Sequence, residues 1–423
     1  MSVAAGQRRT FLRLVAQLRP HWRRDVALAS RIQMLLARER SFGSRDRRLY
    51  RELIHVALRY LPWIEPLLDA DPDGVAAVVA WLAADTPSTR SYRAALLEGW
   101  PPCPPGTMDK AAVLGTRMAI DAAALAAPLP PWFRTHGPAA FAPEQVDALL
   151  ARAPLWVRLQ TSAPAAVFAD FAGRGWTWER SDVLPSAVRL PAETDVTKTE
   201  GYRSGLVEVQ DLGSQMILES AGVARGGRWL DACAGAGGKT LQLASLLGAA
   251  GRVDALDPRP AALEELRSRA RRAGFPLAGA PPPAAARAAA LIATPDRPGG
   301  AYDGVLVDAP CSGSGTWRRA PHLKWTTSPA TIERAAVRQL ALLRASSAHL
   351  RPGGQLVYAT CSLSRRENED VIAAFLGAHP AFSPSPPAET FGFVPDGHGL
   401  GLTILPALHD TDGFFVASMR RQA

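Results

Sequence analysis

The second half of the chain alternates apolar segments with amphipathic ones, and this alternation limits the fold more than any other feature. From about residue 206, segments typical of buried strands are each followed by a segment whose apolar residues recur at helical spacing. Strand–helix alternation predicts an α/β fold, a Rossmann-like parallel sheet with helices on both faces. The expected strands are 228–234, 252–257, 302–310 and 355–362, and the expected helices are 239–248, 260–274, 331–350 and 368–379.

The first half of the chain has a different pattern. Helical spacing is clear in segments 24–39, 44–68 and 108–127, with Ser44 as the expected N-cap of the second. A helix over 143–153 and short strands then mix in the next stretch. We therefore expect three domains: an all-α domain (1–128), a small α/β bridging module (129–205) and the α/β domain (206–423). The Ala/Pro-rich segment 276–300 also belongs to the last domain, but its strand cannot be placed.

Composition narrows the classes of protein that remain. No apolar run approaches the ~20 residues that span a bilayer, and arginines interrupt the N-terminal apolar stretch, so we expect a cytoplasmic chain without a membrane partner. The four cysteines form no CxxC pair and have no histidine at zinc-ligand spacing, which predicts no metal site. Nothing in the sequence requires more than a monomer.

Positive charge is concentrated at the start of the chain. The net charge is +9, whereas residues 1–60 alone hold 14 Arg against 4 acidic residues, a net of +10. Such a block favours a polyanionic partner, most simply nucleic acid. The alternative is a solvated helix surface.

A glycine-rich loop follows the first expected strand of the α/β domain, over residues 231–240. Glycines let the backbone turn sharply and approach a ligand, and the helix that follows presents free N–H groups. Asp257 ends the next strand, where a carboxylate can accept from ribose hydroxyls. A P-loop is disfavoured because Cys233 stands where its first glycine belongs, and the spacing fits GxGxxG poorly. An S-adenosylmethionine loop fits best.

Two cysteines follow the ends of two later strands. Cys311 stands in Asp308-Ala-Pro-Cys311, and Cys361 follows Thr360. Ligands bind beyond the carboxyl ends of strands in an open parallel sheet, so both thiols are expected at the active edge. A pyrimidine carbon 5 becomes nucleophilic when a thiolate adds to carbon 6, and a second thiol can assist release. Asp308 could hydrogen-bond the ring N3 or the exocyclic amine.

Together these motifs resemble the Sun/Fmu (RsmB-like, Nol/Nop/Sun) family of RNA (cytosine-5) methyltransferases. The resemblance covers most of the chain. It rests on the segments 210–215, 231–240, 308–311, 318–325, 360–362 and 412–417. It implies a class I methyltransferase domain, a NusB-like N-terminal RNA-binding domain, and 16S ribosomal RNA as substrate. A tRNA substrate, or a non-catalytic ribosome-assembly factor that retains the fold, is the alternative.

The resemblance also implies roles for individual residues. Cys361 would be the nucleophile, Cys311 the release residue, and Asp308 a further catalytic residue. Apart from the resemblance, we expect the cations Arg318, Arg319 and Lys324 to contact RNA phosphates. The family's acid after the third strand is not evident, and Asp296, the nearest candidate, lies too late in the sequence. Adenosylmethionine contacts would come from Asp231, Cys233, Ala234, Gly235, Ala236, Gly237, Gly238, Lys239, Asp257 and Asp308.

Overall fold

A computed structural model describes residues 2–118, 120–280, 289–299, 301–395 and 398–423. The chain forms two compact units, one of residues 1–152 with 316–329 and the other of residues 153–315 with 330–423. The division into three domains remains a prediction. The structure adds that residues 129–152 and 316–329 pack with the N-terminal helices. Within the described residues, no helix is long and apolar enough to cross a membrane.

The first unit is helical throughout its described part, as the sequence predicts. Buried aromatic side chains such as Trp63, Trp81 and Phe11 form its core. Its helices are α1 (Val3–Leu18), α2 (Leu28–Arg38), α3 (Ser44–Arg59), α4 (Leu61–Ile64), α5 (Leu67–Ala70), α6 (Pro72–Leu82), α7 (Arg90–Leu96), α8 (Thr107–Arg117), α9 (Ala122–Ala126), η1 (Pro131–Thr135), η2 (Pro138–Phe141), α10 (Pro143–Leu150) and α16 (Leu323–Thr326).

Two local expectations for this unit are wrong. Gly43, not Ser44, is the N-cap of α3, and its backbone N–H donates to the Asp46 side chain at 3.0 Å. The expected single helix over 108–127 is two helices, because Met118 is extended and the Asp121 carboxylate caps α9 by accepting from the Ala123 N–H. Apolar spacing alone thus does not reveal this break, after which a short polar side chain, Asp121, caps the start of a new helix.

The second unit contains a small antiparallel sheet and a large mixed one. The small sheet has the order β2-β3-β1-β4. It is formed by β1 (Leu155–Leu159), β2 (Glu179–Arg180), β3 (Ala187–Leu190) and β4 (Val207–Val209), accompanied by α11 (Ala165–Gly173), η3 (Val196–Lys198) and α12 (Glu200–Arg203).

The large sheet has the order β10-β12-β9-β8-β5-β6-β7, with β11 paired to β12. The pairs from β9 to β7 are parallel, and β12 is antiparallel to β9. The strands are β5 (Gly227–Asp231), β6 (Gly251–Ala255), β7 (Leu291–Ala293), β8 (Tyr302–Asp308), β9 (Leu350–Thr360), β10 (Phe382–Ser385), β11 (Leu402–Ile404) and β12 (Phe414–Arg421).

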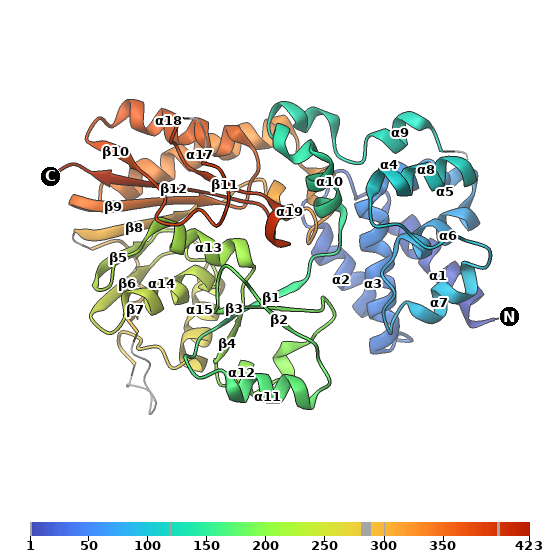
Figure 1. Ribbon diagram of the computed structural model, residues 1–423, viewed down its shortest axis with the longest axis horizontal. Helices are drawn as coiled ribbons and strands as arrows, with labels where there is room; N and C mark the ends of the chain where they lie inside the picture. Colours follow the sequence, from blue (N-terminus) through green and yellow to red (C-terminus); the bar gives the residue numbers. More distant parts are fainter. Residues whose placement is uncertain (1, 119, 281–288, 300, 396–397) are drawn as a thin grey trace. The chain divides into compact units, whose positions relative to one another are not determined.

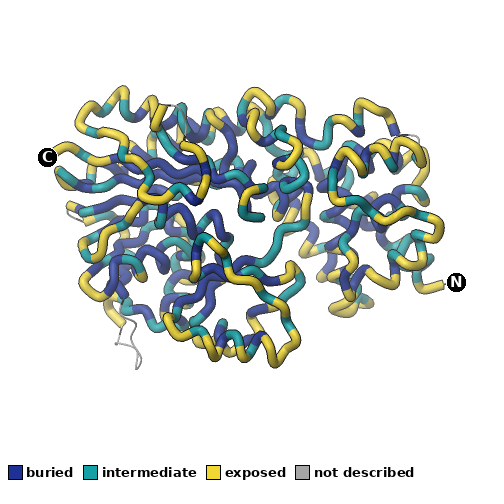
Figure 2. The backbone as a smooth tube through the Cα atoms, viewed as in Figure 1, coloured by how far each residue is buried: buried dark blue, intermediate teal, exposed yellow. Residues whose placement is uncertain are grey.

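Helices cover both faces of this sheet (Figure 1). The strand order runs outward in two directions from β5 and β8, and right-handed crossovers then place the connecting helices on opposite faces. The central strands are buried, as Figure 2 shows. The helices are α13 (Leu212–Ala221), α14 (Gly238–Leu247), α15 (Pro260–Arg272), η4 (Ser314–Thr316), α17 (Pro329–Ser347), η5 (Arg365–Glu367), α18 (Glu369–Ala378) and α19 (Pro406–His409).

The four strands expected at 228–234, 252–257, 302–310 and 355–362 are confirmed as β5, β6, β8 and β9. The strand in the Ala/Pro-rich segment is β7, and it pairs with β6 so that Ala293 lies opposite Asp254. Part of that segment, residues 281–288 and 300, lies outside the described residues. Because the parallel strands share a direction, their carboxyl ends meet at one edge of the sheet.

Candidate active site

A pocket of about 640 Å³ lies beyond the carboxyl ends of β5, β6 and β8. Every residue that the resemblance assigns to the cofactor lines this pocket, except Gly237. Ser214, Ala232, Pro258, Arg259, Pro310, Arg338 and Leu342 also line it and were not predicted. Arg338 and Leu342 come from α17, which is far from the loop in sequence and carries no motif. The pocket volume lies in the range of small-molecule sites.

Glycines shape the loop that forms the pocket wall. Gly235 and Gly237 have φ of +53° and +90°, in the left-handed region that disfavours side chains. A Cβ on Gly237 would lie 2.7 Å from the Leu266 Cγ of α15. Gly237 does not line the pocket, but it permits the turn from β5 into α14, because a side chain there would meet Leu266 and strain the backbone.

We expect Gly237→Ala to destabilise the second unit by roughly 1–3 kcal/mol, because the added methyl group meets Leu266 and the backbone is strained. Urea denaturation would measure this loss, and the variant should also lose affinity for adenosylmethionine. Gly173→Ala is the matched control, because a Cβ there meets nothing within 4 Å. Equal stability of the two variants would contradict the role given to Gly237.

Two carboxylates hold the glycine-rich loop in place through hydrogen bonds. Asp257 accepts from the Gly235 N–H at 3.0 Å, and the Arg259 guanidinium beside it lowers the pKa of this carboxyl. Asp231 is buried and accepts from the Thr240 hydroxyl at 2.7 Å and the Cys233 N–H at 3.3 Å. Burial raises the pKa of Asp231 to about 7, with a further contribution from Asp308. Burial also raises the pKa of the Cys233 thiol to about 12, so this cysteine is protonated at neutral pH.

The raised pKa of Asp231 gives a pH-dependent prediction. An unfolded aspartate has a pKa of about 4, so the folded chain binds this proton more tightly, and stability is lost as pH rises from there to about 7. Asp231→Asn removes this loss, so its stability relative to wild type should increase between pH 4 and 7 and then level off. Urea denaturation at pH 5 and pH 8 would test this, and a pH-independent difference would contradict it.

Asp308 lies at the end of β8, between the loop and the first cysteine. Its Oδ2 accepts from the Lys239 ammonium at 2.8 Å, and Lys239 also lies over the Phe414 ring at 5.6 Å. Both partners of this ion pair line the pocket. The pair thus joins the cofactor loop to the strand that carries Cys311.

The two predicted thiols are in contact. Cys311 Sγ and Cys361 Sγ are 3.3 Å apart, and neither cysteine is in a disulfide. The hydrogen bond with Cys361, together with burial, raises the pKa of the Cys311 thiol well above its ordinary range. Pro310, next to Cys311, lines the pocket, so the thiol pair lies at the pocket's margin.

Asp211, just before α13, forms hydrogen bonds that fix the start of α13 and the start of β12. Asp211 caps α13 through the Gly213 N–H at 2.9 Å and also accepts from the Asp412 N–H, which fixes the start of β12.

Arg269 donates to the Ala236 carbonyl of the loop at 2.8 Å and to Glu208 of β4 at 2.7 Å. The small sheet is thereby linked to the cofactor loop by an arginine that sequence reasoning did not identify.

The predicted phosphate-binding residues are only partly available to RNA. Lys324 is 1% exposed, and its ammonium donates to the Arg59 carbonyl at 2.7 Å within the first unit. Burial lowers its pKa well below the ordinary value. Arg318 is also buried, whereas Arg319 is exposed. The expectation that Lys324 and Arg318 face phosphates is therefore wrong, because segment 316–329 packs into the helical unit.

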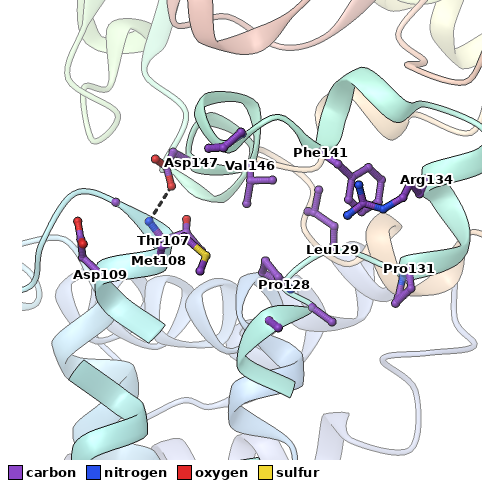
Figure 3. A pocket seen from close by; sticks show the side chains of 14 residues that line it. Thr107, Met108, Asp109, Pro128, Leu129, Pro131, Arg134, Phe141, Val146 and Asp147 are labelled. Atoms are coloured by element: carbon purple, nitrogen blue, oxygen red, sulfur yellow. Dashed lines mark hydrogen bonds between the residues drawn. The ribbon is translucent and has the colours of Figure 1, made fainter. Parts of the chain in front are cut away.

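A second pocket, of about 490 Å³, lies within the first unit (Figure 3). Apolar side chains such as Leu129, Phe141 and Val146 line it, and the Arg134 guanidinium lies 4.3 Å from the centroid of the Phe141 ring. No predicted site residue belongs to this pocket. Its features carry no chemistry comparable with the thiol pair.

The order of the strands, the antiparallel β12 and the pocket at the strand ends define a class: a Rossmann-like class I methyltransferase fold. The solved structure of PH0851 supports this fold, with a TM-score of 0.71 and 18% identity over the whole of both chains. Residues 220–420 match the model described as 16S rRNA methyltransferase RsmB/F. These residues belong to the RsmB/F family of methyltransferases, which confirms the resemblance to the Sun/Fmu family.

Two curated relatives agree with this assignment. The chain is 35% identical over 264 residues to the probable ribosomal RNA small subunit methyltransferase B of Bacillus subtilis, covering 61% of this chain and 57% of the relative. It is 35% identical over 294 residues to the ribosomal RNA small subunit methyltransferase B of Xanthomonas campestris, covering 68% and 65%. The chain thus spans less than two thirds of the length of each.

Proposed function

We propose that this protein is an S-adenosylmethionine-dependent RNA (cytosine-5) methyltransferase that acts on 16S ribosomal RNA. The observation that carries the proposal is the pair of thiols 3.3 Å apart at the strand ends, beside the pocket and its Lys239–Asp308 ion pair. Methylation of an exocyclic nitrogen would not need a cysteine nucleophile. Addition to carbon 6 of a pyrimidine does need one.

The pocket fits the cofactor. Asp257 lies where a carboxylate can accept from ribose hydroxyls, and the Gly235–Gly238 backbone forms a tight turn at the start of α14. The bound cofactor would supply an electrophilic methyl group. Asp296 follows the end of β7 by three residues, but it is exposed and does not line the pocket. Adenine would therefore contact other groups of the pocket wall.

The roles proposed for the protein residues are those that the resemblance implies, and the contact between the two thiols supports them. Cys361 as a thiolate forms a bond with carbon 6 of the cytosine, and carbon 5 becomes nucleophilic. Carbon 5 would then take the methyl group from the sulfonium of the cofactor, whose sulfur–methyl bond breaks to leave S-adenosylhomocysteine. The proton on carbon 5 then passes to a base, the carbon 5–carbon 6 double bond re-forms, and the carbon–sulfur bond breaks to return the Cys361 thiolate. Cys311, as the adjacent thiol, donates a hydrogen bond to the departing sulfur. Asp308 stabilises the adduct at the ring N3 or the amine.

The choice of ribosomal RNA rests on the printed names of the relatives and on the basic block of residues 1–60. Exposed arginines in the described part of this block, such as Arg24, Arg45 and Arg48, can neutralise phosphates. Binding to RNA should then weaken steeply as salt concentration rises.

The test is methyl transfer from labelled adenosylmethionine to unmodified small-subunit RNA, to transfer RNA and to ribosomal particles, with the product nucleoside identified. Formation of 5-methylcytidine in small-subunit RNA supports the proposal. If methyl groups are transferred only to transfer RNA, then transfer RNA is the substrate in place of small-subunit RNA. Failure with every RNA, together with absence of adenosylmethionine binding, would favour a non-catalytic assembly factor.

A further inference from the structure

A buried carboxylate lies behind the two thiols and has no role in the reaction described above. Glu367 ends η5 and is fully buried. Its Oε1 accepts from the Ser312 N–H at 2.7 Å and from the Gln339 side-chain amide at 3.1 Å. Its Oε2 accepts from the Ser362 hydroxyl at 2.6 Å and from the Ser312 hydroxyl. All four donors are neutral groups.

The positions of these donors link the two cysteines. Ser312 directly follows Cys311, and Ser362 directly follows Cys361, so one carboxylate binds the residue after each thiol. Further contacts join the same two loops: the Ser314 and Ser362 hydroxyl oxygens are 3.0 Å apart, and the Gly315 N–H donates to the Cys361 carbonyl at 3.0 Å. Glu367 lies at the centre of this network.

Two of the four hydrogen bonds to Glu367 come from Ser312, the residue after Cys311, and the carboxylate also acts on the Cys311 thiol through its charge. A buried charge that meets only neutral donors interacts strongly with nearby titrating groups. The pKa of Cys311 is raised first by its hydrogen bond with Cys361 and by burial, and Glu367 adds to this rise. Tyr358 of β9 is a further titratable group nearby, and its hydroxyl donates to the main-chain carbonyl of Glu367 at 2.6 Å. Burial raises the pKa of Tyr358 well above its ordinary value, so it stays protonated.

We propose that Glu367 is a positioning residue that holds the Cys311 and Cys361 loops together and whose charge assigns the shared proton of the thiol pair to Cys311. Cys361 is then the thiolate, and Cys311 is the thiol that assists its departure. The proposal deepens the proposed function and rests on it. It explains why a carboxylate, rather than a neutral group of the same shape, occupies this buried position.

Glu367→Gln tests the charge, because glutamine has nearly the same shape and can still bond both serines. Methyl transfer by this variant should show kcat reduced about 10- to 100-fold, with KM for RNA and for adenosylmethionine within about threefold of wild type. Asp370→Asn is the matched control, since this carboxylate pairs with Arg365 at 3.3 Å on the surface. The control should keep the wild-type kcat.

A second measurement does not depend on activity. In a Cys361→Ala background, the rate of Cys311 alkylation by iodoacetamide is followed against pH by mass spectrometry of its peptide, with Glu367 intact or changed to Gln. The midpoint should move down by about one pH unit when the charge is removed. A midpoint that does not move overturns the inference even if kcat falls, because misfolding alone would lower kcat.

The two failures can be distinguished. If the wild-type protein methylates no RNA, the proposed function fails, while the alkylation midpoint still reports on Glu367. If the wild type is active and Glu367→Gln matches it in both kcat and midpoint, the inference fails alone. Should Glu367→Gln unfold, Ser362→Ala removes one of the four hydrogen bonds with less disturbance, and an unchanged kcat in that folded variant would overturn the positioning role.

Discussion

Cys361→Ala should abolish methyl transfer to RNA, with the rate falling by at least about 10³-fold. The alanine side chain cannot bond to carbon 6, so carbon 5 of the cytosine keeps its poor nucleophilicity. Fold and cofactor pocket should be retained, because Cys361 is only partly buried and does not line the pocket. Single-turnover transfer from labelled adenosylmethionine measures the loss, and equilibrium binding of adenosylmethionine shows that the pocket persists.

The matched control is Cys103→Ala, which removes a cysteine from the other unit. Burial raises the pKa of the Cys103 thiol, and no step of the proposed reaction uses it. This variant should transfer methyl groups at the wild-type rate. Activity of Cys361→Ala within tenfold of wild type would exclude Cys361 as the nucleophile.

Cys311→Ala should have a different effect: protein and RNA should accumulate as a covalent complex. The Cys361 thiolate can still add to carbon 6, but the thiol 3.3 Å away no longer assists its departure. The adduct then breaks down slowly, and turnover should fall by roughly 10²-fold or more, in the range of general acid–base contributions. A denaturing gel would show the complex as a slowly migrating band that nuclease treatment removes.

The double variant Cys311→Ala with Cys361→Ala is the control for this result, because it lacks the sulfur that would form the adduct. It should give no covalent band. A band from the double variant would mean that another residue bonds to the RNA. A Cys311→Ala variant that turns over at the wild-type rate, without a band, would remove Cys311 from the mechanism.

Local sequence was enough to predict four parallel strands of the large sheet and the glycine-rich loop of the pocket wall. The first strand ends at Asp231, glycines follow at once, and α14 begins at Gly238. These features are specified within a few residues, by burial of apolar side chains and by backbone freedom at glycine. The meeting of Cys311 and Cys361 could also be predicted, because each follows the end of a parallel strand and such ends share one edge.

Other features could not be predicted from local pattern. Lys324 and Arg318 look like solvent-facing cations, yet segment 316–329 packs with the N-terminal helices and buries them. Whether a charged side chain can be buried depends on the carbonyls that it reaches in the folded chain. For Lys324 this is the Arg59 carbonyl, which is 265 positions away in the sequence. Glu367 lacked any motif that would mark it, because its partners Ser312 and Gln339 come from other elements.

The sequence by itself determined the class of fold, the glycine-rich loop and the identity of the two thiols, since each can be predicted from residue types and spacings within short segments of the chain. The tertiary structure decided the 3.3 Å thiol contact, the Lys239–Asp308 ion pair and the buried Glu367 that joins the two cysteine loops. The physical reason is the short range of the interactions that these groups make. Hydrogen bonds and charge interactions act over a few ångströms, so only folding can bring these groups close enough to set one another's ionisation.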